Sequence, residues 1–254
     1  MFKVLDLFSG IGGFSLGLER TGGFETVAFC EIEPFCRSVL RKHWPKVPIY
    51  EDVRELTADT LRRDGIAVDV ICGGFPCQDI STAGKRTGLK GARSGLWEEY
   101  RRIVGEIRPR FVVVENVASM LGLGMGTVLG DLSTLGYDAI WDCIPASAVG
   151  APHSRDRIWI VAYTANTVRR SHRGGLEGSK GPSRPETQVG PVREGMRNAV
   201  DGGPKESAWW NAEPCIRRVD DGVPRGMDRN RVLGNAVVPQ IVEALGRAIL
   251  AAAA

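Results

Sequence analysis

The first 163 residues alternate between short apolar runs and helical stretches, and this alternation restricts the fold more than any other feature. Apolar runs such as residues 2–8 and 68–72 stop at glycines, as buried strands do. Strands that alternate with helices favour an α/β fold with a doubly wound, largely parallel sheet. The strands are expected over residues 2–8, 26–31, 68–72, 111–114 and 158–162.

Helices are predicted between these strands and at the end of the chain. Residues 14–20 carry apolar side chains up to a pair of glycines, and residues 34–43 begin at a proline, which suits the first turn of a helix. Residues 237–253 return to a helical pattern beside Pro239. The run 111–114 is the most β-branched in the chain and should therefore be a central strand.

Residues 166–207 differ from the rest of the chain because they are rich in glycine and proline and show no periodicity. This composition indicates a loop-rich module, or a disordered segment that becomes ordered on a partner. A chain of 254 residues can hold one large domain and a small appendage. We therefore divide it into residues 1–163, 164–225 and 226–254.

Composition and charge exclude several classes of protein. With 43% hydrophobic and 25% charged residues the chain is typical of globular proteins, and its net charge of +3 is too small for a polybasic protein. Residues 164–232 contain 13 Lys and Arg against 9 Asp and Glu, so the positive excess lies there, where phosphates would be met. No apolar run approaches the roughly 20 residues of a membrane span, and Asp6 comes too early for a signal peptide.

The cysteines and histidines argue against a metal centre. Six cysteines show no CxxC spacing, and there are only three histidines. Six cysteines in a chain of this length do not make a disulfide scaffold either. We expect a cytosolic protein without a metal.

The first candidate site is the glycine turn at residues 6–14. A strand that runs into glycines before a helix lets a ligand approach the backbone. Glu31 follows at the end of the next predicted strand. Its separation in sequence from the glycines is about that of an acid that binds a ribose diol. A plain strand–helix turn with a surface glutamate fits the same residues.

The second candidate is Cys77, which follows Pro76 just beyond a predicted strand end. Ligand crevices of open α/β sheets lie outside these ends, and basic residues from Lys85 to Arg93, without an acid between 80 and 97, would favour a thiolate. The alternative is a small buried cysteine. We assign that role to the cysteines in apolar runs, Cys30, Cys36, Cys72 and Cys143.

Two further candidates carry charge. Glu115 and Asn116 come directly after the run 111–114, where a carboxyl would be desolvated and its pKa raised. Alternatively, Asn116 caps a helix and Glu115 is solvated. Arg155 and Arg157 are two apart in a predicted extended segment, so they should point the same way and hold a phosphate or orient a carboxyl, unless they merely pair with Asp156.

These candidates gain weight together because strand ends of a parallel sheet meet at one edge. One crevice could collect Gly10, Glu31, Cys77 and Glu115. The sequence therefore predicts a nucleoside cofactor, a thiol and a protonatable carboxyl in one site.

In their order along the chain these motifs resemble those of the DNA (cytosine-5) methyltransferases, over residues 1–163 and 226–250. The resemblance implies a Rossmann-like fold that uses S-adenosylmethionine (SAM), with a doubly wound mixed sheet and a small irregular target-recognition domain at 164–225. Residues 1–163 would then be the SAM-binding catalytic domain, and residues 226–254 would contain the helix that returns to it.

The resemblance also implies the cofactor site. Residues 6–14 look like the SAM loop, residues 94–96 like the segment that closes the catalytic loop, and residues 234–240 like the last motif. Phe8 would pack against the adenine, and Asp52 with Val53 would contact its amino group. The implied cofactor-binding residues are Phe8, Gly10, Gly12, Gly13, Glu31, Ile32, Asp52, Val53, Pro76, Leu96, Asn235 and Ala236.

For catalysis, the resemblance implies that Cys77 attacks C6 of a flipped-out cytosine while Glu115 protonates or hydrogen-bonds N3. Asn116 would hold the loop of Cys77, and Arg157 would steady Glu115. The implied catalytic residues are Cys77, Glu115, Arg157, Asn116, Arg155, Gln78 and Pro76, and the implied DNA contacts are Ser81, Lys85 and Arg86.

The chain departs from the usual motifs at His153, where glutamine is common, and at Ala236, where serine is common. We expect a monomer that acts on a short site in double-stranded DNA, as in phages and restriction–modification systems. A tRNA cytosine-5 methyltransferase and a catalytically inactive DNA-binding protein remain alternatives. A nicotinamide dehydrogenase would leave Cys77 unexplained.

Overall fold

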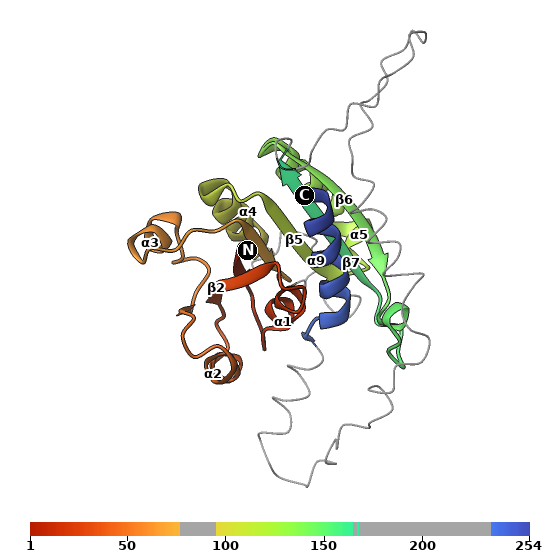
Figure 1. The fold of residues 1–254 in the computed structure, drawn as a ribbon. Coiled ribbons are helices and arrows are strands. Elements are labelled where there is room, and N and C mark those ends of the chain that lie inside the picture. Colours follow the sequence, from red (N-terminus) through yellow and green to blue (C-terminus); the bar gives the residue numbers. More distant parts are fainter. Residues whose placement is uncertain (77–94, 165–166, 168–234) are drawn as a thin grey trace.

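The computed structural model describes residues 1–76, 95–164, 167 and 235–254 (Figure 1). The predicted Cys77 loop lies outside the described residues, with Gln78, Ser81, Lys85 and Arg86. So does the predicted recognition segment 164–225, except Thr164 and Thr167.

Within the described residues, seven strands form one sheet in the order β3-β2-β1-β4-β5-β7-β6. Strands β3, β2, β1, β4 and β5 pair in parallel, whereas β7 is antiparallel to both of its neighbours. The sheet is therefore mixed, and the prediction of a largely parallel sheet holds for its first five strands only. The strands are β1 (Phe2–Leu7), β2 (Phe24–Cys30), β3 (Ile49–Tyr50), β4 (Val70–Gly73), β5 (Phe111–Val117), β6 (Tyr137–Ile144) and β7 (Arg157–Thr164).

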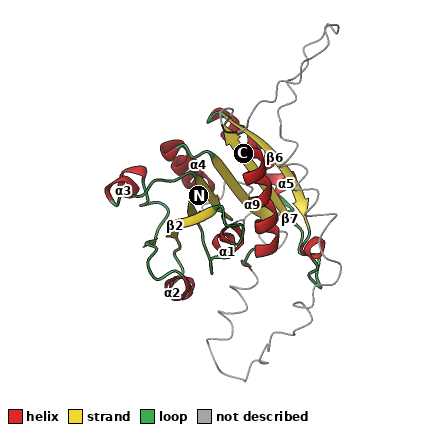
Figure 2. Ribbon diagram, viewed as in Figure 1, coloured by secondary structure: helices red, strands yellow, loops and turns green. Residues whose placement is uncertain are grey.

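Helices cover both faces of this sheet (Figure 2). One layer contains the helix over residues 95–107 together with three shorter ones, and the other layer contains the first and last helices. The helices are α1 (Gly13–Glu19), α2 (Pro34–His43), α3 (Ala58–Arg63), α4 (Gly95–Ile107), α5 (Met120–Leu123), α6 (Met125–Thr134) and α9 (Pro239–Ala253), with a short 3-10 helix at Ala146–Val149.

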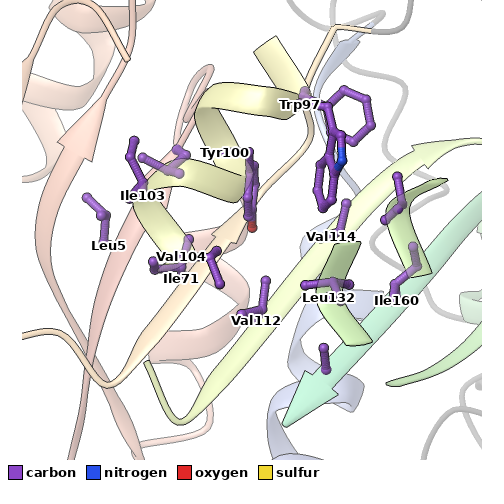
Figure 3. Packing of buried hydrophobic residues seen from close by; sticks show 14 of the residues in the cluster. Leu5, Ile71, Trp97, Tyr100, Ile103, Val104, Val112, Val114, Leu132 and Ile160 are labelled. Atoms are coloured by element: carbon purple, nitrogen blue, oxygen red, sulfur yellow. The ribbon is translucent and has the colours of Figure 1, made fainter. Parts of the chain in front are cut away.

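The alternation of side chains along β5 divides the core into two clusters. Val112 and Val114 face α4, whereas Phe111 and Val113 face α1 and α9. Figure 3 shows the first cluster, in which apolar side chains of α4 pack on β4 and β5. These side chains recur at helical spacing, at Trp97, Tyr100, Ile103 and Val104.

The C-terminal helix α9 packs closely against α1, although the two are far apart in the sequence (Figure 1). A Cβ at Gly17 would lie 2.4 Å from the carbonyl oxygen of Pro239 and 2.6 Å from Cβ of Val242. A Cβ at Gly13 would lie 2.7 Å from Cγ2 of Val237. Glycine at these two positions therefore allows the backbones to approach, and this brings residues 235–238 to the glycine turn.

Candidate active site

A cleft of about 610 Å³ lies along the carboxyl ends of the parallel strands. Its volume falls in the range of small-molecule sites. Glu31 from the end of β2 and Glu115 from β5 both line it, together with residues just before α9. The predicted site residues in its walls are Phe8, Gly10, Gly13, Glu31, Ile32, Asp52, Val53, Pro76, Leu96, Glu115, Asn116, Arg157, Asn235 and Ala236.

The glycine turn forms one wall of the cleft. Phe8 and Gly10 both have positive φ angles, of 52° and 54°, so the chain turns sharply as β1 ends. Apart from Gly10 and its chain neighbours, no atom of the described residues lies within 4 Å of the position that a Cβ on Gly10 would occupy. The backbone therefore leaves open space at Gly10, inside the cleft.

The carboxylate of Glu31 joins this turn to the end of β2. One of its oxygens accepts the amide of Gly10 at 2.7 Å, and the other accepts the amide of Glu33 at 2.7 Å. Burial raises the pKa of Glu31 in spite of these bonds. A carboxylate with two fixed oxygens and free lone pairs is an acceptor for two neighbouring hydroxyls.

Gly12 is not among the residues that line the cleft, and its predicted contact with the cofactor stays a prediction. A Cβ at this position would lie 2.6 Å from the ring of Trp44, and its φ is +84°. Trp44 is held by an edge-on contact with Phe29 and by a 2.9 Å hydrogen bond from Nε1 to Glu19. Gly12 thus lets the turn rest on a fixed aromatic ring.

Glu115 and Arg157 form the charged end of the cleft. Both lie on one face of the β5–β7 ladder, where Glu115 pairs with Trp159 and Val117 pairs with Arg157, so they are diagonal neighbours. Arg157 Nε contacts a carboxylate oxygen of Glu115 at 2.9 Å. Burial raises the pKa of Glu115 to about 7, although Arg157 and Arg155 oppose the shift. The predicted direction of the shift is confirmed.

Strand β5 is longer than predicted. It continues through Glu115 and Asn116 to Val117, because antiparallel pairing with β7 supplies partners for these residues. Successive side chains alternate, so Asn116 points to the face opposite Glu115. Its Nδ2 donates to the carbonyl oxygen of Phe75 at 3.1 Å, just before Pro76. Asn116 therefore holds the backbone that leads to Cys77.

Gly74 makes room for Glu115, a role that the sequence analysis missed. A Cβ at Gly74 would lie 2.7 Å from Oε2 of Glu115. Two adjacent glycines after a strand are a signal for such a close approach.

Aromatic rings connect the two walls of the cleft. Phe8 stacks on Tyr100 at 6.3 Å between centroids, Tyr100 stacks on Trp97 at 5.5 Å, and Trp97 contacts Phe75 at 5.3 Å. Tyr100 and Trp97 project from α4 (Figure 3). The glycine turn and the segment before Cys77 are thus packed against one helix, which had not been predicted.

Arg155 does not have the extended backbone conformation that its spacing from Arg157 predicts. Its φ is +37°, in the left-handed region, and its Nη2 donates to the carbonyl oxygen of Ala236 at 2.8 Å. Arg155 is half-buried, and burial lowers its pKa. It therefore connects the start of β7 to the segment before α9, which lines the cleft.

Asp6 is a second buried carboxyl, beneath the glycine turn. It is fully buried, and its Oδ2 accepts hydrogen bonds from Oγ of Ser15 at 2.8 Å and from the Ser15 amide at 3.3 Å. Burial raises the pKa of Asp6 to about 8. Its position in the apolar β1 run was the available signal.

The other cysteines follow the predictions in part. Cys30, Cys36 and Cys72 are buried, as expected, whereas Cys143 is only half-buried because it lies on the edge strand β6. The described residues contain no cluster of three or more His, Cys, Asp or Glu side chains suited to a metal ion. None of the helices in the described ranges has the length and apolar character of a membrane span.

Comparisons with known proteins give a consistent result. The pattern of the family named C-5 cytosine-specific DNA methylase matches residues 2–194. The chain is similar to the Type II methyltransferase M2.BsuMI of Bacillus subtilis, with 38% identity over 168 residues, covering 63% of this chain and 41% of that protein. The chain therefore spans less than half the length of this relative.

Two further matches support this result. The Type II methyltransferase M.AquIA of Picosynechococcus is 32% identical over 176 residues, covering 63% of this chain and 71% of that protein. The solved structure of the methyltransferase EhMeth of Entamoeba histolytica matches with a TM-score of 0.67 and 15% identity, covering 99% of this chain and 98% of that chain. At this identity the likeness concerns the fold alone.

Proposed function

This chain belongs to the C-5 cytosine-specific DNA methylase family, and from this premise we propose that it transfers a methyl group from SAM to C5 of a cytosine in a short duplex DNA sequence. One observation carries the proposal. The carboxyl of Glu115, with a pKa near 7, lies beside Arg157 in the cleft that Pro76 also lines, one residue before Cys77.

The residues of the cleft fit SAM. Glu31 offers two fixed acceptor oxygens for a ribose diol, and open space at Gly10 lets a ligand approach the backbone. Phe8, Ile32 and Leu96 supply apolar surface for a flat base. When bound, SAM supplies an electrophilic methyl group on a sulfonium.

The reaction that we propose begins at Cys77. Its thiolate adds to C6 of the cytosine and forms a C–S bond, and the electron pair of the C5–C6 double bond becomes available at C5. This pair forms the bond from C5 to the methyl group while the methyl–sulfur bond breaks and a neutral thioether, S-adenosylhomocysteine, leaves. A protonated Glu115 donates to N3 and so neutralises charge that develops on the ring. A base then removes the C5 proton, and the Cys77 thiolate leaves as the double bond re-forms.

The pair of Glu115 and Arg157 suits this step. Because burial raises the pKa of Glu115 to about 7, both the protonated donor form and the ionised acceptor form are accessible near neutral pH. Asn116 holds the backbone at Phe75 and thereby places the segment that leads to the thiol.

A cytosine inside a duplex cannot reach the cleft, so we propose that the base is flipped out, at a cost of a few kcal/mol. Ser81, Lys85 and Arg86 lie outside the described residues, and we propose them as contacts to DNA phosphates. The small segment 164–225 is proposed as the reader of a short site. A cytosolic monomer remains our expectation.

The test is covalent trapping. Methylation-sensitive sequencing of DNA from a host that expresses the protein identifies the target. DNA with 5-fluorocytosine at that target should then form a denaturation-resistant complex only when SAM is present, because fluorine cannot leave C5 as a proton does. Cys77→Ala should abolish both trapping and methylation. Cys143→Ala is the matched control, since Cys143 lies on β6 and does not line the cleft.

The outcomes separate the alternatives. Methylation by Cys77→Ala, or an active preparation that fails to trap, would overturn the covalent mechanism. Labelled-methyl transfer to tRNA but not to duplex DNA would show that the substrate is tRNA. DNA binding without any methyl transfer would indicate an inactive binding protein.

A further inference from the structure

Arg102, on α4, reaches the turn that carries Asp52 and Val53. Its Nη2 donates to the carbonyl oxygen of Val53 at 3.0 Å and to that of Leu56 at 2.9 Å. One guanidinium nitrogen therefore fixes two carbonyl groups of a segment that lies far away in the sequence. Arginine suits this role because its donors have a rigid planar arrangement.

The remaining donors of Arg102 are held by its own helix. Nε contacts Glu99 at 2.7 Å and Nη1 contacts Glu106 at 2.7 Å. The second carboxylate oxygen of Glu106 accepts the amide of Ala58 at 3.0 Å. Arg102 and Glu106 thus hold both ends of the segment from Val53 to Ala58, through two carbonyls and one amide.

This segment needs external support because β3, which precedes it, contains only two residues, Ile49 and Tyr50, at the edge of the described sheet. The turn is closed internally by the carbonyl of Asp52, which accepts the amides of Glu55 and Leu56. Burial of its apolar side chains fixes how deeply the turn sits in the core, whereas the hydrogen bonds from Arg102 fix the orientation of its carbonyl groups.

The turn forms the end of the cleft that is most distant from Glu115 in strand order. Glu31 directly follows β2, which lies between β3 and the strands that lead to β5. A nucleoside with its diol on Glu31 and its reactive group toward Glu115 would place its base on the β3 side. There, the carboxylate of Asp52 lies in the cleft wall, kept ionised by Arg54, which lowers its pKa. An ionised carboxylate accepts from an amino group and repels a carbonyl oxygen.

We propose that Arg102 is a positioning residue for this turn and, through it, sets the preference of the cofactor site for a 6-amino purine over a 6-oxo purine. The inference rests on the proposed function, because it takes SAM as the occupant of the cleft. Arg102 acts through the turn, so its loss weakens recognition of the base and leaves the reacting end unchanged.

The test compares two ligands in four proteins. Calorimetry measures the Kd of S-adenosylhomocysteine and of its inosine counterpart, which has a 6-oxo group, for the wild type, Arg102→Met, Arg102→Lys and Arg247→Met. Arg247 is the matched control because it forms an ordinary ion pair with Glu243 on α9 and, within the described ranges, donates to no distant backbone carbonyl.

The wild type should prefer the adenosine compound. Arg102→Met should weaken its binding by about tenfold and reduce the preference by a similar factor, as expected when hydrogen bonds to a turn are lost. Arg102→Lys, which keeps the charge and one flexible donor group, should show an intermediate loss. Arg247→Met should match the wild type, and kcat at saturating SAM should stay near the wild-type value in all variants.

A merely structural role would weaken both ligands equally, so an unchanged preference in Arg102→Met and Arg102→Lys would overturn the inference. If Arg102→Met fails to fold, Arg102→Lys alone decides, through the ratio of its Kd values for the two ligands. A wild-type protein that binds neither ligand would overturn the proposed function and with it this inference, whereas binding with an unchanged ratio in the variants overturns the inference alone.

Discussion

The two ends of the cleft are built in different ways. At the β5–β7 end, the polar groups are side chains of paired strands, Glu115 and Arg157, and the ladder itself places them. At the β2–β3 end, backbone amides hold Glu31, and Arg102 holds backbone carbonyls. Strand register therefore positions the polar groups at the end proposed for chemistry, whereas tertiary contacts to turns position those at the end proposed for binding.

The carboxyls at the two ends also differ in protonation. Burial raises the pKa of Glu115 to about 7, whereas hydrogen bonds from Arg54 lower the pKa of Asp52. A carboxyl that must carry a proton is therefore fully buried, and one that must accept hydrogen bonds is only partly buried beside an arginine.

The largest effect is expected for Glu115→Gln. The variant cannot protonate N3, so kcat should fall by about 10²–10⁴-fold, the usual contribution of a general acid. SAM affinity, measured by calorimetry, should stay close to that of the wild type. Glu243→Gln, on the surface of α9, serves as the control. Near-normal turnover in Glu115→Gln would refute the role of the carboxyl.

Arg157→Met should change the pH dependence as well as the rate. Arg157 opposes the upward pKa shift of Glu115, so its loss should raise that pKa further. In the wild type the protonated form is lost as the pH rises through about 7, so the rate of the chemical step, measured in single-turnover experiments, should decline there. In Arg157→Met the decline should begin at a higher pH, from a kcat about 10–100-fold lower. A decline at lower pH would contradict the assignment.

Two glycine substitutions should separate the two ends of the cleft. Gly74→Ala places a Cβ 2.7 Å from Oε2 of Glu115, so kcat should fall by about tenfold while SAM affinity is retained. Gly12→Ala places a Cβ 2.6 Å from Trp44 at a positive φ, so the free energy of unfolding should fall by about 1–3 kcal/mol and SAM affinity should weaken. Denaturant titration and calorimetry distinguish the two results. If both variants changed kcat and SAM affinity to the same extent, the two ends of the cleft would not have separate roles in chemistry and binding.

The last expected effect is on the pH dependence of stability and involves Asp6. The pKa of the Asp6 carboxyl is about 8 in the folded state, and its ordinary value, taken for the unfolded state, is 3.8. At a pH between these two values the folded state therefore binds more protons than the unfolded state. The free energy of unfolding should therefore fall as the pH rises from about 4 to 8, by at most about 1.4 kcal/mol per pH unit for this group. Asp6→Asn, which imitates the protonated acid, should flatten that slope in urea titrations. An unchanged slope would show that another group is responsible.

Much of the fold follows from local pattern. The predicted strands at residues 2–8, 111–114 and 158–162 exist with shifted ends, and α2 begins and ends where Pro34 and the following pattern indicate. The mixed sheet is confirmed, since the antiparallel β7 accompanies the five parallel strands. Strand ends were misjudged because pairing with a neighbour, rather than propensity, decides where β5 stops.

The candidate site was predictable where a side chain sits at a strand end. Glu31 and Glu115 line the same cleft, as their positions after apolar runs suggest. The extended conformation predicted for Arg155 was wrong, and the contact of Gly12 with Trp44 was not predicted, because tertiary packing and positive φ angles set both. The predicted roles of Cys77 and its loop stay predictions, since these residues lie outside the described part of the chain.

The sequence by itself determined the family, the order of the motifs and the chemical types of the site residues, because periodicity and short motifs are written in neighbouring residues. Only the tertiary structure decided which of these residues share the cleft, how far burial raises the pKa of Glu115, and that Arg102 holds the turn of Asp52 from another helix. Burial and long-range hydrogen bonds depend on segments far apart in the chain, and such contacts exist only once the sheet has placed its strand ends side by side.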